Sequence, residues 1–580
     1  TTTAVANITV SAQVGTTAGK NADKTVSFIA DSASAQVSAV TLTDSVVSKV
    51  ADGKNTFTYT VTVKDSNGNP VLGAAVAPKA DKSGVSAKAT SATDANGQTT
   101  ITLTSTTTAV ANITVSAQVG STASKNADKT VSFIADSASA QVSTVALIGS
   151  DVSKVADGKN TFTYTVTVKD SNSNPVSGAI VSPKADKSGV STKISGATDA
   201  NGQTTVTLTS STTAVGNITV SAQVGSTTAK NADKTVSFIA DSASAQVSTV
   251  TLVGSDVSKV ADGKNTFTYT VTVKDSNGNP VSGATVSPKA DKSGVSAKAA
   301  GATDANGQTT IILTSTTTSV ANITVSAQVG TTGSVNADKT VSFIADSASA
   351  QVSTVTLVGS EVSKVADGKN AFTYTVTVKD SNGNLVSGVT VSPKADKPGV
   401  STKISGATDA NGQTTITLTS TTTAVANIAV SAQVGSTAAK NADKTVSFIA
   451  DSASAQVSAV TLTDSVVSKV ADGKNTFTYT VTVKDSHGNL VSGVTVSPKA
   501  DKSGVSTKIS GATDANGQTT ITLTSSTTAV ANITVSAQVG STAAKNADKT
   551  VSFIADSASA QVSTVTLVGS EVSKVADGKN

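Results

Sequence analysis

The sequence predicts an all-β protein in which sandwich domains follow one another in an elongated tandem array. Three observations predict this fold class: one stretch alternates apolar with hydroxyl side chains, the stretch recurs at a fixed spacing, and Thr, Ser, Ala and Val dominate the composition. Alternation with a period of two residues is typical of a half-buried strand, and Thr and Val favour strands over helices.

The alternating stretch is clearest between residues 261 and 286. One side of an extended segment is apolar and the other carries hydroxyls, because Phe267, Tyr269, Val271 and Val273 alternate with Thr268, Thr270 and Thr272. The segment then enters residues 275–280, where Asn and Gly accept a positive φ and Pro fixes its own φ. An apolar segment resumes at Val281, so the pattern predicts a strand, a turn and a second strand.

The motif ADGKN marks each recurrence of this stretch. It begins at Ala51, Ala156, Ala261, Ala366, Ala471 and Ala576, with a constant period of 105 residues. A period of this length can enclose a core of its own, whereas the units of solenoid proteins are shorter. We therefore predict five complete domains, called copies 1 to 5 below, with a partial domain at each end; the boundaries are 1–33, 34–138, 139–243, 244–348, 349–453, 454–558 and 559–580.

Copy 1 contains seven short segments with strand character. They cover residues 40–42, 57–63, 71–76, a weaker segment around 85 and 87, and then 99–104, 113–119 and 131–133. Seven alternating strands in about 100 residues, separated by Gly, Asn, Asp and Pro turns, are typical of an immunoglobulin-like sandwich. Because the chain has no Cys and no Trp, we expect a disulfide-free form in which Phe57, Tyr59 and Phe133 fill most of the aromatic core.

Residues 1–33 are predicted to be the end of a further domain. Two strands are expected there, at residues 8–14 and 25–29, with Val26 and Phe28 pointing inward. The stretch begins without Met and contains neither an apolar leader nor a run of 18 apolar residues. We therefore expect export signals and the membrane anchor to lie outside this sequence.

Composition argues against several classes of function. The net charge of +4 comes from 43 basic and 39 acidic residues spread evenly over the repeats, so nucleic-acid binding is not expected. Without Cys there are no disulfides and no thiolate metal sites. No nucleophile, base and orienting group recur together, and His487 is the only His. We expect no catalytic residues, no metal, no cofactor and no small-molecule substrate.

Three motifs occur in the same order in every complete copy, with small substitutions: ADGKNTFTYTVTVKDSNGNPVSG, TDANGQTTITLTS and VSFIAD. Together they resemble the group-one bacterial Ig-like domains of the intimin and invasin adhesins, over essentially the whole chain. The resemblance implies a stalk made of such domains, as in inverse autotransporters, with a membrane anchor at one end and often a lectin-like binding domain at the other. It also implies a location on the extracellular side of a bacterial outer membrane.

The turn DSNGN at residues 65–69 resembles the opening of a calcium loop. Its Gly stands at the fourth place instead of the sixth, however, and no Glu closes the loop at the twelfth. A hairpin turn is the favoured interpretation. Copy 2 has Ser173 where copy 1 has Gly68, which argues against a strict requirement for Gly at that position.

Other candidate sites also have simpler interpretations. Residues 112–114 match a glycosylation acceptor, but they lie in a predicted strand, and copy 4 has Ala429 in place of the required Thr. His487 lies in a turn, where a solvated side chain is expected. An isopeptide bond between Lys and Asn would need an Asp as its buried acid, since Glu occurs only at Glu361 and Glu571.

Two functions from different classes remain open. The first is structural, a stalk that holds a distal binding domain away from the bacterial surface. The second is a binding module whose repeated faces contact a host ligand, another cell or an identical chain, with avidity from weak contacts. Copies 1 and 5 share TLTDSVVSKV, whereas copies 3 and 4 have TLVGS, which indicates recent duplication of blocks and favours the stalk.

The connection between copies is predicted to be stiff. The sequence SASAQ follows each VSFIAD, and it is short and lacks a run of Gly or Pro. Such a linker limits bending between neighbours. We therefore expect the copies to form an elongated rod.

Overall fold

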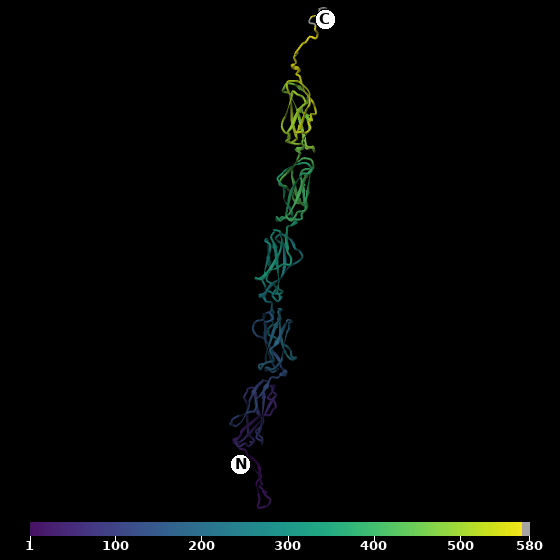
Figure 1. Ribbon diagram of the computed structural model, residues 1–580. Coiled ribbons are helices and arrows are strands. Elements are labelled where there is room, and N and C mark those ends of the chain that lie inside the picture. Colours follow the sequence, from purple (N-terminus) through teal and green to yellow (C-terminus); the bar gives the residue numbers. More distant parts are fainter. Residues whose placement is uncertain (571–572, 574–580) are drawn as a thin grey trace.

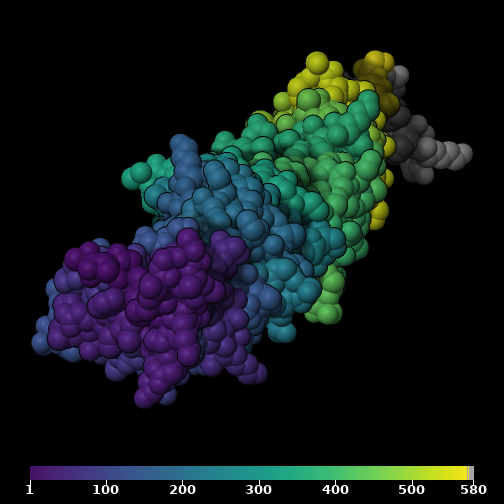
Figure 2. Space-filling view, turned by 90° about the horizontal axis from the view of Figure 1, so that it is seen from below, coloured from purple at the N-terminus to yellow at the C-terminus, as the bar shows by residue number. Residues whose placement is uncertain are grey.

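The computed structural model describes residues 1–570 and 573, and in it the copies lie end to end as one long rod (Figure 1). The chain passes through the copies in sequence order, from purple at the N-terminal end to yellow at the C-terminal end. Seen from below in Figure 2, the N-terminal residues lie in front and the later copies follow behind them. The predicted all-β fold and its elongated tandem arrangement are confirmed.

Copy 3 shows the architecture that all complete copies share. Its strands are β25 (Gln246–Leu252), β26 (Ser258–Val260), β27 (Thr266–Lys274), β28 (Val286–Ala290), β29 (Val295–Ala299), β30 (Gln308–Ser315), β31 (Val320–Ile323), β32 (Val325–Val329), β33 (Val335–Asn336) and β34 (Val341–Ile344). One layer is the sheet β25-β27-β30-β29. The other layer consists of β26-β34-β31 and β28-β32-β33, which are linked where β31 leads into β32.

The other complete copies have the same ten strands, shifted by multiples of 105 residues. Copy 1 contains β5 (Gln36–Leu42), β6 (Ser48–Val50), β7 (Thr56–Lys64), β8 (Val76–Ala80), β9 (Val85–Ala89), β10 (Gln98–Ser105), β11 (Val110–Ile113), β12 (Val115–Val119), β13 (Lys125–Asn126) and β14 (Val131–Ile134). Copy 2 contains β15 (Gln141–Leu147), β16 (Ser153–Val155), β17 (Thr161–Lys169), β18 (Val181–Ala185), β19 (Val190–Ile194), β20 (Gln203–Ser210), β21 (Val215–Ile218), β22 (Val220–Val224), β23 (Lys230–Asn231) and β24 (Val236–Ile239).

Copy 4 contains β35 (Gln351–Leu357), β36 (Ser363–Val365), β37 (Ala371–Lys379), β38 (Val391–Ala395), β39 (Val400–Ile404), β40 (Gln413–Ser420), β41 (Val425–Ile428), β42 (Val430–Val434), β43 (Lys440–Asn441) and β44 (Val446–Ile449). Copy 5 contains β45 (Gln456–Leu462), β46 (Ser468–Val470), β47 (Thr476–Lys484), β48 (Val496–Ala500), β49 (Val505–Ile509), β50 (Gln518–Ser525), β51 (Val530–Ile533), β52 (Val535–Val539), β53 (Lys545–Asn546) and β54 (Val551–Ile554).

Each complete copy encloses a separate hydrophobic core. In copy 3, the apolar side of β27 faces this core, and Phe267, Tyr269, Val271 and Val273 are all buried. The rings of Phe267 and Phe343, one from each layer, lie 5.0 Å apart with an interplanar angle of 61°. The predicted alternation and the predicted aromatic core are therefore confirmed.

The tyrosine at the centre of each core has a buried hydroxyl without a hydrogen-bond partner. Burial raises the pKa of Tyr269 to about 12, with a smaller contribution from the negative charge of Asp338. An unpaired polar group in an apolar environment costs free energy, whereas a Phe ring of the same shape would not.

We expect Tyr269→Phe to stabilise copy 3 by about 1 kcal/mol, because the substitution removes a buried unpaired hydroxyl and keeps the ring. Urea denaturation of residues 244–348 would measure the change. A loss of stability of about 1 kcal/mol or more would contradict this expectation and show that the hydroxyl is bonded in solution.

The strand predicted at residues 71–76 is wrong in position. After β7 the chain makes only an isolated bridge between Lys64 and Pro70. Val71 is buried, which explains the apolar signal, but Gly73 takes a φ of +80° and the chain turns toward the other layer. Strand β8 begins at Val76 in a different sheet from β7, so the two strands are not a hairpin.

The strand predicted at residues 113–119 is divided in two. The break falls at Thr114, and β11 and β12 pair with different strands, β14 and β8. Asn112, with a φ of +55°, lies within β11 just before this break. Ile113, Val115 and Ala117 are nevertheless buried on one side, as the alternation predicts. The very short β6 and β13 escaped prediction, since two or three residues show no periodicity.

Residues 1–33 form four short strands where two were predicted. They are β1 (Val5–Ile8), β2 (Ser11–Ala12), β3 (Lys20–Asn21) and β4 (Val26–Phe28). The inward orientation predicted for Val26 and Phe28 does not bury them, since their side chains are 52% and 56% exposed. These 33 residues do not include the other strands that cover the equivalent side chains in the complete copies.

Candidate functional site at the junctions between copies

The DSNGN turn lies at the end of each copy that faces the preceding copy. In copy 3, the Oδ1 atom of Asp275 accepts the N–H groups of Asn277 and Asn279, both at 2.9 Å. The Asp275 N–H donates to the Asn279 carbonyl at 2.9 Å, and Gly278 takes the required positive φ of +87°. Asp supplies the acceptor and Gly the left-handed backbone, so the local sequence determines the turn.

The side chain of Asn279 joins this turn to copy 2. Its Oδ1 accepts the N–H of Ala214, and its Nδ2 donates to the carbonyl of Thr212, both at 2.8 Å. The same Nδ2 donates to Oδ2 of Asp275 at 2.9 Å. Oδ2 of Asp275 also accepts the N–H of Asp241, at 3.0 Å. We call Asp275, Asn279 and their three partners in copy 2 the interdomain clamp.

The interdomain clamp recurs at five junctions. Its central pairs are Asp65 and Asn69, Asp170 and Asn174, Asp275 and Asn279, Asp380 and Asn384, and Asp485 and Asn489. Each Asn accepts an N–H from the preceding copy, or for Asn69 from the partial domain, at 2.8 Å. Directional hydrogen bonds between buried groups fix how two surfaces are oriented. The same set of bonds therefore constrains all five junctions, and the junction of copies 3 and 4 has a further bond from Asn382 Nδ2 to the carbonyl of Ala261 at 3.4 Å.

The linker between copies is also held in place. Each SAS segment forms a short 3-10 helix: η1 (Ser32–Ser34), η2 (Ser137–Ser139), η3 (Ser242–Ser244), η4 (Ser347–Ser349), η5 (Ser452–Ser454) and η6 (Ser557–Ser559). The side chain of Asp241 caps η3 by accepting the N–H of Ala243 at 3.0 Å. Ser244 Oγ accepts the N–H of Ser276 in the DSNGN turn at 3.3 Å. The proposed domain boundaries fall within these helices.

The hydrogen bonds of the interdomain clamp favour the charged form of its carboxylate. Burial alone would raise the pKa of Asp275, but the N–H groups of Asn279, Asp241 and Asn277 outweigh it and lower the pKa. The corresponding carboxylates in copies 2, 4 and 5 are shifted in the same direction for the same reasons. At Asp65 the hydrogen bond from the Asn69 side chain is the strongest influence, and the pKa falls from 3.8 to about 2.

We expect acid to open the interdomain clamps. A carboxylate whose pKa is lowered by its bonds stabilises the junction above its ordinary pKa of 3.8, and this stabilisation is lost as the pH falls below 3.8 through the lowered pKa, which is about 2 at Asp65. Small-angle X-ray scattering should show the same rod at neutral pH and at about pH 5, and a more flexible chain between about pH 4 and pH 2. Circular dichroism at each pH would verify that the sheets persist. A rod that stays equally stiff down to about pH 2 would contradict the role of these carboxylates.

A lysine side chain on the short strand β26 forms a hydrogen bond with the backbone at the start of β27. Nζ of Lys259 donates to the carbonyl of Thr266 at 2.6 Å and lies 5.0 Å from the centre of the Phe267 ring. Copies 1 and 5 add an ion pair, since Lys49 and Lys469 lie 2.5 Å from Asp44 and Asp464. Copies 2 to 4 have Gly at the position of this Asp.

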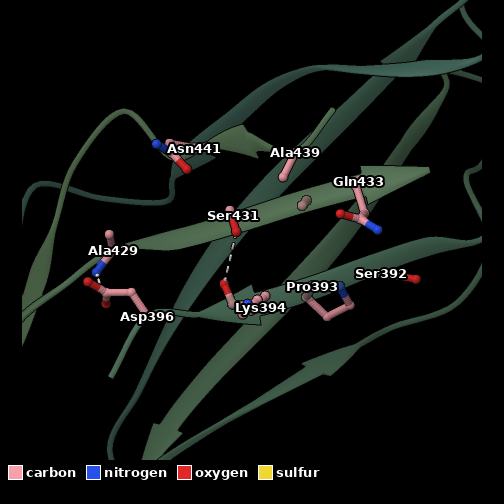
Figure 3. A pocket seen from close by; sticks show the side chains of 10 residues that line it. Ser392, Pro393, Lys394, Asp396, Ala429, Ser431, Gln433, Ala439 and Asn441 are labelled. Atoms are coloured by element: carbon pink, nitrogen blue, oxygen red, sulfur yellow. Dashed lines mark hydrogen bonds between the residues drawn. The ribbon is translucent and has the colours of Figure 1, made fainter. Parts of the chain in front are cut away.

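A shallow hollow of about 700 Å³ lies on the sheet of β38, β42 and β43 in copy 4. Figure 3 shows that two of its polar contacts are with the protein's own backbone. Ser431 Oγ donates to the Lys394 carbonyl at 3.4 Å, and Oδ1 of Asp396 accepts the Ala429 N–H at 2.8 Å. A smaller hollow lies at the same place in copy 2, around Asp186 and Ser221. The hollow is thus a recurring polar surface feature.

Comparison with protein families identifies the repeated unit. The profile of the bacterial Ig-like domain (group 1) matches residues 39–134, 144–239, 249–344, 354–449 and 459–554. The chain belongs to the group-one bacterial Ig-like domain family. The predicted resemblance to these domains is therefore confirmed. No curated protein is significantly similar to the chain.

Several solved structures are similar to the chain. FdeC, an Escherichia coli adhesin, has 23% identity and a TM-score of 0.34, with 55% of this chain and 99% of that chain covered. Invasin, a bacterial integrin-binding protein, has 21% identity and a TM-score of 0.33, with 71% of this chain and 79% of that chain covered. The D0-D1 domain of intimin has 30% identity and a TM-score of 0.16, with 35% of this chain and 98% of that chain covered.

The turn considered as a calcium loop is the centre of the interdomain clamp in every Ig-like domain. Four N–H donors reach the two oxygens of Asp275, and a carboxylate has about four lone-pair sites, so the oxygens that would bind Ca²⁺ are engaged in hydrogen bonds. Ser173 keeps the left-handed backbone of Gly68, with a φ of +70°. The position therefore requires a positive φ even where Gly is absent.

The remaining candidate residues are not brought together in the Ig-like domains. Asn112 lies exposed at the end of β11, where its N–H donates to Ser132 Oγ at 2.9 Å. His487 lies exposed in its turn, as predicted. The contact most similar to an isopeptide pair joins Lys49 to Asp44, an Asp, and not to an Asn. Glu361 is exposed in a loop of copy 4, and Glu571 lies outside the described residues.

Within residues 1–570 and 573, no three His, Asp or Glu side chains are grouped as metal ligands would be. None of the helices in this part of the chain has the length and apolar character needed to span a membrane.

The interdomain clamp could not be predicted from residues that are neighbours in the sequence, because Asn279 and Ala214 are 65 residues apart.

Proposed function

We propose that the chain is the stalk of a bacterial surface adhesin, in which tandem Ig-like domains project a distal binding domain from the outer membrane. The observation that carries this proposal is the interdomain clamp, which repeats the same hydrogen bonds at five junctions. A chain of independent cores with uniform junctions converts added repeats directly into added length. Similarity to FdeC, invasin and intimin supports a place on the cell surface.

The stalk needs no catalytic machinery, and we propose that the chain is not an enzyme. Its partners would be the domains that flank the stalk. Host-cell contacts would then belong to the distal domain. Nucleic acids and small-molecule substrates have no part in this function.

Deletion of residues 244–348 tests the proposal. Five sandwiches with strands of roughly 25–35 Å would stack into a rod on the order of 150–200 Å, and removal of one copy should shorten it by about one fifth. The junction that forms is equivalent to the two removed, because Asn384 would meet Thr212 and Ala214 in place of Thr317 and Ser319. Asp380 would likewise meet the N–H of Asp241 in place of that of Asp346. Scattering from the two chains would measure the shortening. An unchanged maximum dimension would contradict the stalk.

A binding module is the second candidate, because the polar hollow recurs on the same sheet in copies 2 and 4. Repeated weak sites along a rod would give avidity toward a host surface or an identical chain. Ser221→Arg and Ser431→Arg would fill both hollows. Concentration-dependent self-association that these substitutions abolish would favour this function over a passive stalk.

A further inference from the structure

One strand pair in each copy differs from all the others. Among the strands of residues 1–570, only β26 with β34 and its equivalents pair in parallel; every other pairing is antiparallel. In copy 3 the partners are Ser258 with Ser342, Lys259 with Phe343 and Val260 with Ile344. Strand β26 lies near the start of the copy, and β34 is its last strand.

Tension along the chain would act on this pair by shear. A pull on the two ends draws β26 toward its own N-terminal side and β34 toward its own C-terminal side. Because the two strands run in the same direction, these forces are opposed and parallel to the strands. All the hydrogen bonds between the strands are then loaded together, whereas a strand peeled from its end loses its bonds one at a time.

Further bonds strengthen both ends of the parallel pair. The N–H of Ser342 donates to the carbonyl of Val257, and the N–H of Ala261 donates to the carbonyl of Ile344, both at 2.8 Å. Between these two backbone bonds, the Lys259 side chain links β26 to β27 by donating to the Thr266 carbonyl. Equivalent backbone bonds and an equivalent lysine are found in all five copies.

We propose that the parallel pair is the force-bearing element of each copy, so that the chain acts as a tether that resists tension between the surface and its distal end. This inference rests on the proposed stalk and adds a mechanical function to it. Strand β25, which precedes β26, has six residues paired with β27 and is loaded along its length as well. Resistance to force depends on the rate of unfolding under load, which is a property distinct from equilibrium stability.

Single-molecule force spectroscopy of the full chain, pulled from its two ends, tests this inference. Ala261→Pro removes the N–H that donates to Ile344 at one end of the parallel pair. Leu313→Ala, in the buried face of β30, is the matched control, because it removes core packing away from the load path. Thermal denaturation of both variants would record their loss of equilibrium stability.

We expect Ala261→Pro to lower the unfolding force of one of the five peaks well below that of the other four. Leu313→Ala should leave the unfolding force of copy 3 similar to that of the other copies, even though its loss of thermal stability is equal or greater. The inference would be overturned if both variants lowered the unfolding force of copy 3 equally, or if Ala261→Pro left this unfolding force unchanged. If the Pro variant shows only four peaks because copy 3 does not fold, Lys259→Met decides in the same way: a weaker peak supports the inference and an unchanged one overturns it. Failure here would leave the rod length measured by scattering unaffected, so it is distinguishable from failure of the stalk.

Discussion

Phe267→Ala will lower the free energy of unfolding of copy 3 by about 3–5 kcal/mol, since it removes a buried ring and leaves a cavity in the core. The Phe267 side chain is 2% exposed and contacts Phe343 across the sandwich. The ring also supports the Lys259 ammonium group. Urea denaturation of residues 244–348 followed by circular dichroism would measure the loss.

Thr268→Ala is the matched control for this prediction. Thr268 is the next residue on β27 and points to the other side of the sheet, so its replacement should cost less than about 1 kcal/mol. If the two substitutions destabilise the copy equally, the register of β27 is wrong and so is the assignment of the core.

Gly307→Ala will destabilise the same copy by about 2–5 kcal/mol, because both the backbone and the surroundings exclude a Cβ atom. Gly307 has a φ of +70°, and an added Cβ would lie 2.5 Å from the carbonyl oxygen of Val273. The Gly307 carbonyl also accepts the Val273 N–H at 2.8 Å, so a shift to relieve the clash would break this bond. Thermal and urea denaturation would both register the effect.

Gly278→Ala is the control that measures the free-energy penalty of the left-handed backbone without the steric clash expected at Gly307. Gly278 has a φ of +87°, but an added Cβ would meet no atom within 4 Å. Its replacement should cost only the penalty of the left-handed backbone, about 1–2 kcal/mol. A loss as large as that of Gly307→Ala would show that the close approach to Val273 does not matter.

The sequence predicted most of the fold because the cores depend on local periodicity. The alternation of Phe267, Tyr269, Val271 and Val273 identified both a strand and its buried face, and the period of 105 residues separated the copies. Prediction was wrong where one residue redirects the backbone. Gly73, with a positive φ, precedes the start of β8 at Val76. The irregular backbone around the left-handed Asn112 precedes the break at Thr114, where one predicted strand is divided between two pairings.

The interdomain clamp was not predictable from the sequence, because its partners lie in separate domains. The DSNGN motif gave a correct turn from the local preferences of Asp and Gly. Nothing near Asn279 in sequence, however, indicates that its amide bonds to Thr212 and Ala214. The available signal was the recurrence of the turn as DSNGN, DSNSN or DSHGN, with Asp first and Asn last in every complete copy, since a solvated turn does not need Asn at its end.

The clamp and the separate cores together explain how such a chain can vary in length. The fully buried residues of each core come from one copy, and one partly buried alanine of the preceding copy, such as Ala240 or Ala345, packs against them. Because an equivalent alanine is present at every junction, a copy can be added or lost without exposing apolar surface of its neighbours. The bonds of Asn279 go to backbone atoms of the preceding copy, which do not depend on side-chain identity. Ser319 accordingly takes the place of Ala214 at the next junction with the same hydrogen bond.

The central claim is that the interdomain clamp holds neighbouring copies in one orientation, and the distance between two spin labels tests it most directly. The chain has no Cys, so Lys193→Cys and Lys298→Cys place labels only at equivalent exposed positions on β19 and β29 of copies 2 and 3. Double electron–electron resonance should give one narrow distance distribution in the full chain. It should broaden strongly with Asn279→Ala and stay narrow with Asn277→Ala, a turn residue whose side chain takes no part in the clamp. A distribution that is already broad in the parent chain, or that Asn279→Ala leaves unchanged, would contradict the account.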